Sequence, residues 1–445
     1  MNSFDERSSA TRDAWYICFV LLLTFAFNYL DRSIISILVD PIKREFGIND
    51  TTIGLLQGGA FAVFYVVFSL PLSRVADRGN RRNLLLTGVV LWCTATASCG
   101  LVHSVPELFL ARIMVAIGEA VLMPCAVSML SDSFLPQQRG RALGIFSMGP
   151  YLGGAAAAIG GGTLLHSFRS SSVNVPWFGM LSAWRAVFLV VGVLGFILVP
   201  LLLMVREPAR FRDDGRRAEQ PASVGQLYRE LRRKRLAILT VIFGFSFIAM
   251  AGQTLQAWVP TLFIRAHAWN VKQAGVRLGL TALVLGPLGA ISGGVLADRL
   301  GRRGWLNSKV ILGGLAALIS VFASLVLTLP GALVAMVGVA SVYFLFGFTY
   351  GLSQASIADL MPNRMRAQTT SLYSLVNNLL AAGLGPLLVG VLNDHVFHDP
   401  MKIGESMRIV LPTAFLIAAG LLSWGRGAVR HAVADARSGT VSVET

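Results

Sequence analysis

The chain of 445 residues contains twelve runs of predominantly apolar residues. A helix of about 20 apolar residues spans the hydrocarbon core of a bilayer, which is about 30 Å thick. Hydrophobic residues make up 54% of the chain and charged residues only 14%, against about 25% charged residues in soluble domains. A soluble enzyme, a disordered chain and a fibrous repeat are therefore excluded. We predict an all-α membrane protein with twelve transmembrane helices, at roughly residues 14–40, 51–73, 84–103, 107–131, 141–166, 184–205, 236–265, 273–297, 308–329, 331–358, 367–393 and 406–427.

One long polar stretch, residues 206–235, interrupts the apolar pattern at its middle. It contains turn-forming residues and ten arginines or lysines, which is typical of a linker. We therefore expect an N-terminal six-helix bundle at residues 1–205, a cytoplasmic linker at 206–235, a C-terminal six-helix bundle at 236–430 and a cytoplasmic tail at 431–445.

The distribution of basic residues predicts the orientation of the chain in the membrane. If the N-terminus is cytoplasmic, 27 of the 38 Lys and Arg residues fall in cytoplasmic loops, linker and tails, and 9 fall on the opposite side. Lys and Arg concentrate in cytoplasmic loops, so we expect both termini in the cytoplasm and the protein in the inner (plasma) membrane. Residues 1–13 are polar and carry three acidic residues, so no cleavable signal peptide is expected.

Two pairs of loops reveal an internal repeat. Residues 75–82 (VADRGNRR) resemble residues 296–303 (LADRLGRR), with the aspartates 221 residues apart. Residues 135–142 (LPQQRGRA) resemble residues 361–367 (MPNRMRA), with their final alanines 225 residues apart. Two pairs at nearly one offset predict two parallel six-helix repeats, an architecture of transporters whose substrate site lies between the halves.

The Asp-Arg loops of the two repeats are candidates for a mechanical role. An aspartate at a helix end accepts hydrogen bonds from arginines and is favoured beside a neighbouring helix N-terminus. The alternative is a pair of solvated turns. We expect a gating motif that holds the cytoplasmic face closed, made of Asp77, Arg78, Arg81, Asp298, Arg299 and Arg302.

These loops and the repeat resemble the major facilitator superfamily over nearly the whole chain. The match is close in the second half, whereas in the first half Ser73 replaces the leading glycine and Gly79-Asn80 replaces the usual x-Gly. The run DRGNRR at residues 77–82 resembles the Spinster-like branch, whose animal members move lysophospholipids or sphingoid phosphates. Further resemblance to this branch lies in residues 28–32 (NYLDR), Arg112, Gly118-Glu119, residues 359–368 and Gly385-Pro386.

Four ionisable residues lie inside the predicted spans of the first half: Asp31, Arg32, Arg112 and Glu119. Each such group costs about 2.5–3.5 kcal/mol to insert, so these residues usually pair or face a cavity. At 1.5 Å per residue the four groups share one band of depth, and Arg112 and Glu119, two turns apart, lie on one helix face. Asp40, at the outer end of the first span, is expected to be a solvated helix end.

These two acidic and two basic residues together carry no net charge, and the set has two interpretations: a static network of ion pairs or a proton-coupled anion site. The resemblance implies proton coupling at Asp31 and Glu119 and anion binding at Arg32, and Arg112 is the second candidate ligand. Because an anion on Arg32 competes with Glu119, binding and protonation would be linked. The polar residues in the predicted spans of the second half are mostly uncharged. Among them, Asn377 and Gln354 are candidate substrate ligands, and the alternative is that each forms hydrogen bonds to a neighbouring helix.

We therefore expect a proton-coupled secondary transporter of an amphiphilic organic anion resembling a lysophospholipid or sphingoid phosphate. The organic-anion branch of the superfamily shares the NYxDR run and the glutamate, so symport of sugar acids is the alternative, and drug export ranks below both. The sequence contains no GxSxG, HExxH or Walker-type loop, which argues against an enzyme or an ATP-driven pump. A channel and a non-transporting receptor are further alternatives. We expect no cofactor, metal or nucleic-acid partner, and a monomer whose partners are its substrate, protons and the lipid bilayer.

Overall fold

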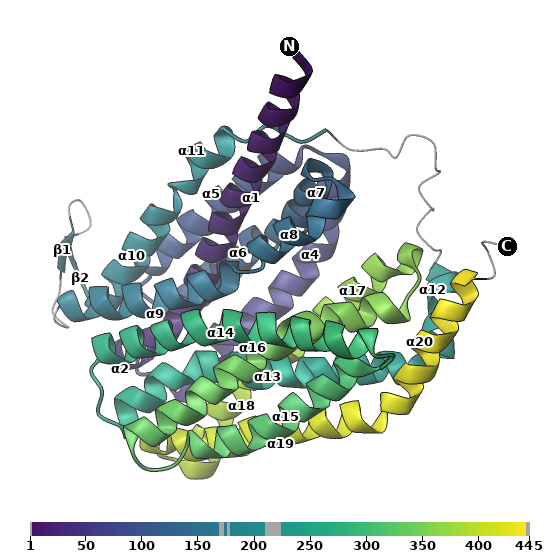
Figure 1. The fold of residues 1–445 in the computed structure, drawn as a ribbon. Coiled ribbons are helices and arrows are strands. Elements are labelled where there is room, and N and C mark those ends of the chain that lie inside the picture. The colour runs from purple at the N-terminus through teal and green to yellow at the C-terminus, as the bar shows by residue number, and fades with distance from the viewer. Residues whose placement is uncertain (1, 169–172, 176–178, 210–223, 442–445) are drawn as a thin grey trace. The chain divides into compact units, whose positions relative to one another are not determined.

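The computed structural model describes residues 2–168, 173–175, 179–209 and 224–441, which are almost entirely helical (Figure 1). Among these residues, 11 helices are long and apolar enough to cross a membrane, and the predicted all-α membrane fold is confirmed. The other predicted span, at residues 84–103, is helix α5 (Arg81–Cys99), whose 19 residues begin with two arginines that lower its hydropathy. Residues 210–223 of the predicted linker lie outside the described residues.

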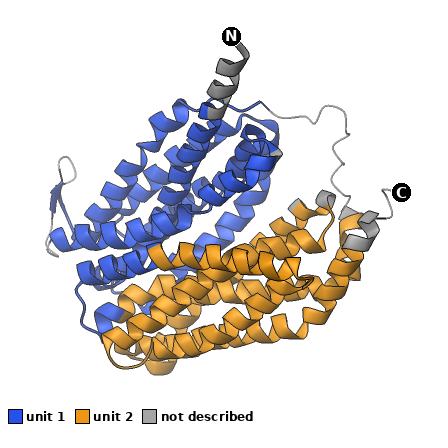
Figure 2. Ribbon diagram, viewed as in Figure 1, with its two compact units in different colours: residues 1–211, 263–283 blue, residues 212–262, 284–445 orange. Residues whose placement is uncertain are grey.

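The chain forms two compact units (Figure 2). Unit 1 comprises residues 1–211 and 263–283, and unit 2 comprises residues 212–262 and 284–445. Residues 263–283, the end of α13 and the start of α14, therefore pack with the first half of the chain. The division into bundles at residues 1–205 and 236–430 concerns the repeat rather than packing, and it stays a prediction.

Unit 1 contains a long first helix, a series of shorter helices and a β-hairpin. Strands β1 and β2 pair antiparallel, with Val173 opposite Leu181. The elements are α1 (Asn2–Ile34), a 3-10 turn (Ile35–Ile37), α2 (Val39–Phe46), α3 (Asp50–Gly54), a π-helical segment (Leu55–Gly59), α4 (Ala60–Arg78), α5, α6 (Val105–Glu119), α7 (Leu122–Ser133), α8 (Pro136–Phe146), α9 (Gly149–Ser167), β1 (Val173–Val175), β2 (Gly179–Leu181), α10 (Ala183–Gly195) and α11 (Leu198–Leu203).

Unit 2 consists of longer helices with two amphipathic helices at its boundaries, α12 and α20. Helix α15 packs against both α16 and α19. The elements are α12 (Val224–Arg233), α13 (Arg235–Ala266), α14 (Val271–Arg302), α15 (Ser308–Val326), α16 (Ala332–Leu360), α17 (Asn363–Asn377), a π-helical segment (Asn378–Leu384), α18 (Gly385–Leu392), a second π-helical segment (Asn393–Phe397), a 3-10 turn (Pro400–Lys402), α19 (Ile403–Trp424) and α20 (Arg426–Val441).

Three predicted spans of the first half are interrupted just before a proline, in addition to the 3-10 turn after α1 and the π-helical segment before α4. α6 ends at Glu119 before α7, α8 ends before α9, and α10 ends before α11. Pro124, Pro150 and Pro200 lack an N–H and crowd the carbonyl four residues earlier, which breaks the helix at that point. The break after Glu119 ends α6 at an acidic side chain.

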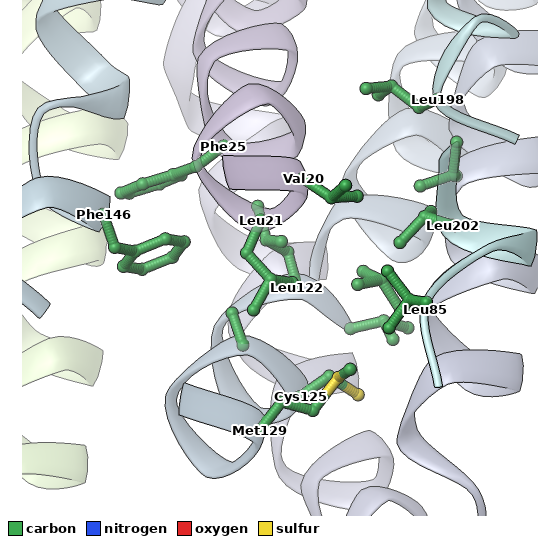
Figure 3. Packing of buried hydrophobic residues seen from close by; sticks show 14 of the residues in the cluster. Val20, Leu21, Phe25, Leu85, Leu122, Cys125, Met129, Phe146, Leu198 and Leu202 are labelled. Atoms are coloured by element: carbon green, nitrogen blue, oxygen red, sulfur yellow. The ribbon is translucent and has the colours of Figure 1, made fainter. Parts of the chain in front are cut away.

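Buried apolar side chains from seven helices form the core of unit 1, part of which Figure 3 shows. The rings of Phe25 in α1 and Phe146 in α8 stack with centroids 4.7 Å apart. Leu85 of α5, Leu122 of α7 and Leu198 of α11 are fully buried in the same cluster. This core holds α1 against the helices that carry the remaining charged residues of the first half.

Gly118 lets α6 pack directly against α5. A Cβ atom at Gly118 would lie 2.9 Å from the carbonyl oxygen of Gly88, and one at Gly88 would lie 2.8 Å from the carbonyl oxygen of Gly118. Only glycine permits backbones to approach this closely without a shift. The close crossing buries the neighbouring side chain, Glu119, between helices.

Candidate functional site

Asp31 and Arg112 form a buried ion pair between α1 and α6. Nη1 of Arg112 lies 3.3 Å from Oδ1 of Asp31 and 3.4 Å from its carbonyl oxygen. The hydroxyl of Thr96, in α5, donates a second hydrogen bond to the Asp31 carboxylate. All three side chains are at least nine-tenths buried. Asp31 thus joins three helices, and the sequence interpretation missed Thr96 because a threonine in an apolar helix carries no distinctive signal.

Two of the four ionisable residues, Glu119 and Arg32, are not part of the Asp31–Arg112 ion pair. The Glu119 side chain is 1% exposed, and neither of its carboxylate oxygens has a well-aligned hydrogen-bond partner among the described residues. Arg32 is only half-buried, and no carboxylate in the described part of the chain lies within the 4.0 Å of an ion pair. Electrostatic interactions link Glu119 to both arginines and to Asp31.

Phe61 of α4 lies between the two guanidinium groups. The guanidinium carbon of Arg32 is 4.6 Å from the Phe61 ring centroid, and that of Arg112 is 5.9 Å away. Cation–π attraction holds a guanidinium against a ring without neutralising its charge. Arg32 is thereby positioned but keeps its hydrogen-bond donors for an anion. Phe61 was not singled out in the sequence, although a helix rich in phenylalanine offers such rings.

The two uncharged candidates lie in unit 2. Asn377 ends α17 directly before a π-helical segment, and its side-chain oxygen is buried without a partner among the described residues. Gln354, in α16, is exposed. Both residues stay candidate substrate ligands on the chemistry of their side chains.

Arg81 is buried at the end of the first Asp-Arg loop, for which a gating role is predicted. Its guanidinium forms ion pairs with Asp132 of α7 and with Glu207, at 2.7 Å from Nε, and it donates hydrogen bonds to Ser128 and to the carbonyl of Pro208, each at 2.8 Å. Glu207 also accepts the backbone N–H of Arg82, at 2.9 Å, at the N-terminus of α5, where the helix dipole favours an anion. The sequence interpretation missed Asp132 and Glu207.

The Asp-Arg loops of the two repeats differ in their ion pairs. Asp77 and Arg78 are exposed, and in the second half Asp298, Arg299 and Arg302 are exposed as well. These three residues of the second loop form no ion pair within the described residues. An ion pair between Lys309 and Asp359 joins α15 to α16 nearby. The sequence symmetry of the loops therefore does not extend to their contacts.

Replacing Arg81 by alanine should loosen this end of unit 1. Breaking a buried ion pair costs about 3–5 kcal/mol, and the partial exposure of both carboxylates reduces the expected loss to roughly 3 kcal/mol. Cys125, buried in α7, serves as the reporter once Cys18, Cys93 and Cys99 are changed to alanine. We expect faster maleimide labelling of Cys125 and a lower unfolding temperature.

Arg74→Ala is the matched control, because Arg74 lies at the same end of α4, outside the predicted gating motif, and is exposed. It should leave both the labelling rate of Cys125 and the unfolding temperature unchanged. Equal labelling of Cys125 in Arg81→Ala and the parent protein would contradict a closing role for the Arg81 cluster.

A second ionic cluster lies at the end of unit 1 that is predicted to face outside. Arg265, near the end of α13, lies 2.7 Å from Asp40 and 2.9 Å from Asp50, and Lys43 also binds Asp50. The expectation of a solvated Asp40 is therefore wrong. Tertiary packing brings Arg265 to this carboxylate from 225 residues away, a distance at which sequence spacing carries no signal.

Glu45 anchors the segment between the first two spans to α10. It accepts hydrogen bonds from Ser182, Trp184 and Arg185, and the Arg185 pair measures 2.7 Å. Partial burial by itself would raise the pKa of Glu45, but these three hydrogen bonds and the charge of Arg185 outweigh it and lower that pKa. This cluster is structural, and no part of it reaches the charged set around Asp31.

Comparison with known proteins identifies the fold. The model of the Major Facilitator Superfamily matches residues 21–386. The chain belongs to the major facilitator superfamily. It is 30% identical to an MFS-type efflux pump of Mycolicibacterium smegmatis over 92% of this chain and 91% of that protein. It is 26% identical to a hexuronate transporter of Bacillus subtilis over 92% of both chains.

A solved structure points to one branch of the superfamily. A bacterial homologue of the human lysosomal transporter Spinster, in an inward-facing and unoccupied conformation, superposes with a TM-score of 0.75 at 26% identity, covering 95% of this chain and 97% of that one. The predicted Spinster-like resemblance is confirmed. The protein is a multi-pass membrane protein of a transporter family.

Proposed function

We propose that this major facilitator protein is a proton-coupled secondary transporter of an amphiphilic organic anion, acting by alternating access. The observation that carries the proposal is Arg32, a half-buried guanidinium held by the ring of Phe61 but by no carboxylate within ion-pair distance in the described chain. Such a group is free to bind a carboxylate or phosphate through two parallel hydrogen bonds. Beside it lies Glu119, a buried acid that can exchange a proton.

The four charged residues have different roles in this proposal. Arg112 is fully buried and paired with Asp31, so we propose that this pair orients α1 and α6 and that Asp31 takes part in proton coupling through it. An anion on Arg32 adds negative charge next to Glu119 and thereby favours its protonation. By linkage, protonation of Glu119 favours anion binding equally.

The relatives and the aromatic residues beside Arg32 support the proposed substrate class. We favour a lysophospholipid or sphingoid phosphate, because the Spinster homologue resembles the chain over nearly its whole length and Phe61 and Tyr65 stack beside Arg32. A small organic anion such as a sugar acid is the second candidate, supported by the hexuronate transporter among the relatives. We also propose cytoplasmic termini, an inner-membrane location and a monomer.

Flux into proteoliposomes tests the proposal. Vesicles with and without a pH gradient should be supplied with a fluorescent lysophosphatidate, read by albumin back-extraction, and with radiolabelled D-glucuronate. We expect the pH gradient to accelerate one of them and leave the other at the rate of protein-free vesicles. Flux that the pH gradient does not change for either substrate would contradict proton-coupled transport of these anions.

A further inference from the structure

Gln57 is a buried amide without a hydrogen-bond partner. It lies in the π-helical segment Leu55–Gly59 and is 7% exposed. Neither its side-chain nitrogen nor its side-chain oxygen has a partner among the described residues. Buried polar groups in native proteins nearly always have a partner, and an exception calls for a functional explanation.

The backbone at Gln57 is unusual as well, which is an independent observation. A single π-helical turn separates α3 from α4. Such turns inside α-helices occur frequently at functional sites, because the extra residue redirects the side chains around it. Both the amide and the backbone therefore distinguish this position from the rest of the helix.

Gln57 lies about one helical turn before the residue that contacts the candidate anion ligand. Phe61, four residues later, is the ring beneath Arg32, and Tyr65, another four residues later, stacks on Phe61 with centroids 5.8 Å apart. At 1.5 Å per residue, Gln57 is about 6 Å along the helix from Phe61.

We propose that Gln57 is a second recognition residue, which binds a hydroxyl group of the same anion that Arg32 holds. A primary amide offers both donors and an acceptor, so it matches a hydroxyl group, which is donor and acceptor as well. The ligand is therefore a hydroxylated organic anion whose hydroxyl lies about one helical turn from its charge. This inference rests on the proposed role of Arg32.

Replacing Gln57 by leucine separates a recognition role from a structural one. If the amide has a structural partner, its removal should destabilise the protein. If the amide is buried without a partner and is kept for a ligand, its removal should leave the stability of the free protein unchanged or raise it. We expect Gln57→Leu to unfold at the same or a higher temperature than the parent. Its affinity for the hydroxylated anion should fall about tenfold.

Two matched pairs of probes identify the ligand chemistry by titration calorimetry in detergent. One pair is 1-oleoyl lysophosphatidate and its 2-deoxy analogue, and the other is D-glucuronate and cyclohexanecarboxylate, which lacks the hydroxyls. The parent protein should prefer the hydroxylated member of one pair, and that pair distinguishes a lipid from a sugar acid. Gln57→Leu and Gln57→Asn should lose the preference while binding the other member unchanged.

The possible results distinguish the role of Gln57 from that of Arg32. Equal binding of both members by the parent protein, or a retained preference in Gln57→Leu, overturns the role of Gln57 and leaves that of Arg32 intact. A lower unfolding temperature of Gln57→Leu with unchanged discrimination shows a structural amide. If Gln57→Leu does not fold, Gln57→Asn decides by the same readouts. Loss of binding of both members in Arg32→Ala confirms the anion site, and no binding of any probe by the parent overturns both proposals.

Discussion

Vesicles containing the Glu119→Gln variant should exchange substrate across the membrane but should not accumulate it in response to a pH gradient. Glutamine has the shape of the protonated acid, so it permits the steps that the protonated carrier performs. It cannot release a proton, so the half of the cycle that requires the ionised carrier stops. Counterflow and pH-driven uptake, measured in the same vesicles, distinguish the two activities. We expect near-normal counterflow and a loss of nearly all pH-driven accumulation.

The matched control is Glu107→Gln, the same change in the same helix. Glu107 lies in the first turn of α6 and is exposed, so both activities should remain near those of the parent. Full pH-driven accumulation in Glu119→Gln would show that protons are coupled elsewhere or not at all, and the proposed mechanism would then be wrong.

The Arg32→Ala variant should lose about a hundredfold in affinity for the transported anion, and Arg32→Lys about tenfold. The planar guanidinium holds a carboxylate or phosphate with two hydrogen bonds, whereas an ammonium group acts as a point charge. Lysine also stacks less well on Phe61, which fixes the position of the guanidinium. Calorimetric titration of the purified variants gives the three affinities.

Arg277→Ala serves as the control for the loss of a stacked guanidinium. Arg277 lies 4.7 Å from the ring centroid of Trp269 and is exposed, so its removal should leave the affinity unchanged. Near-normal affinity in both Arg32 variants would mean that Arg32 only holds α1 against α4.

The sequence predicted the helices because hydropathy is a local property. The spans at 308–329 and 331–358 correspond closely to α15 and α16, since an apolar run of this length is a helix whatever its neighbours are. The interruptions of the first-half spans were also within reach, because Pro124, Pro150 and Pro200 break the helix locally. The two amphipathic helices and the β-hairpin were missed, because hydropathy averaged over a span does not detect them.

Which charges pair could not be read from the chain. Spacing placed Asp31, Arg32, Arg112 and Glu119 in one band of depth, but ion pairing depends on the rotation of each helix about its axis and on what packs between them. Only the structure shows that Arg112 binds Asp31 whereas Arg32 stacks on Phe61. It also brings Glu207 to Arg81 and Arg265 to Asp40.

By itself, then, the sequence determined the class of fold, the position of the spans, the repeat and the family, all of which follow from local apolar runs and short motifs. The tertiary structure alone decided which buried groups are paired and which, such as Gln57 and the Glu119 carboxylate, have no well-aligned hydrogen-bond partner among the described residues. The physical reason is that the cost of a buried polar group depends on the few atoms within hydrogen-bond distance, and in this fold those atoms come from helices far apart in the chain.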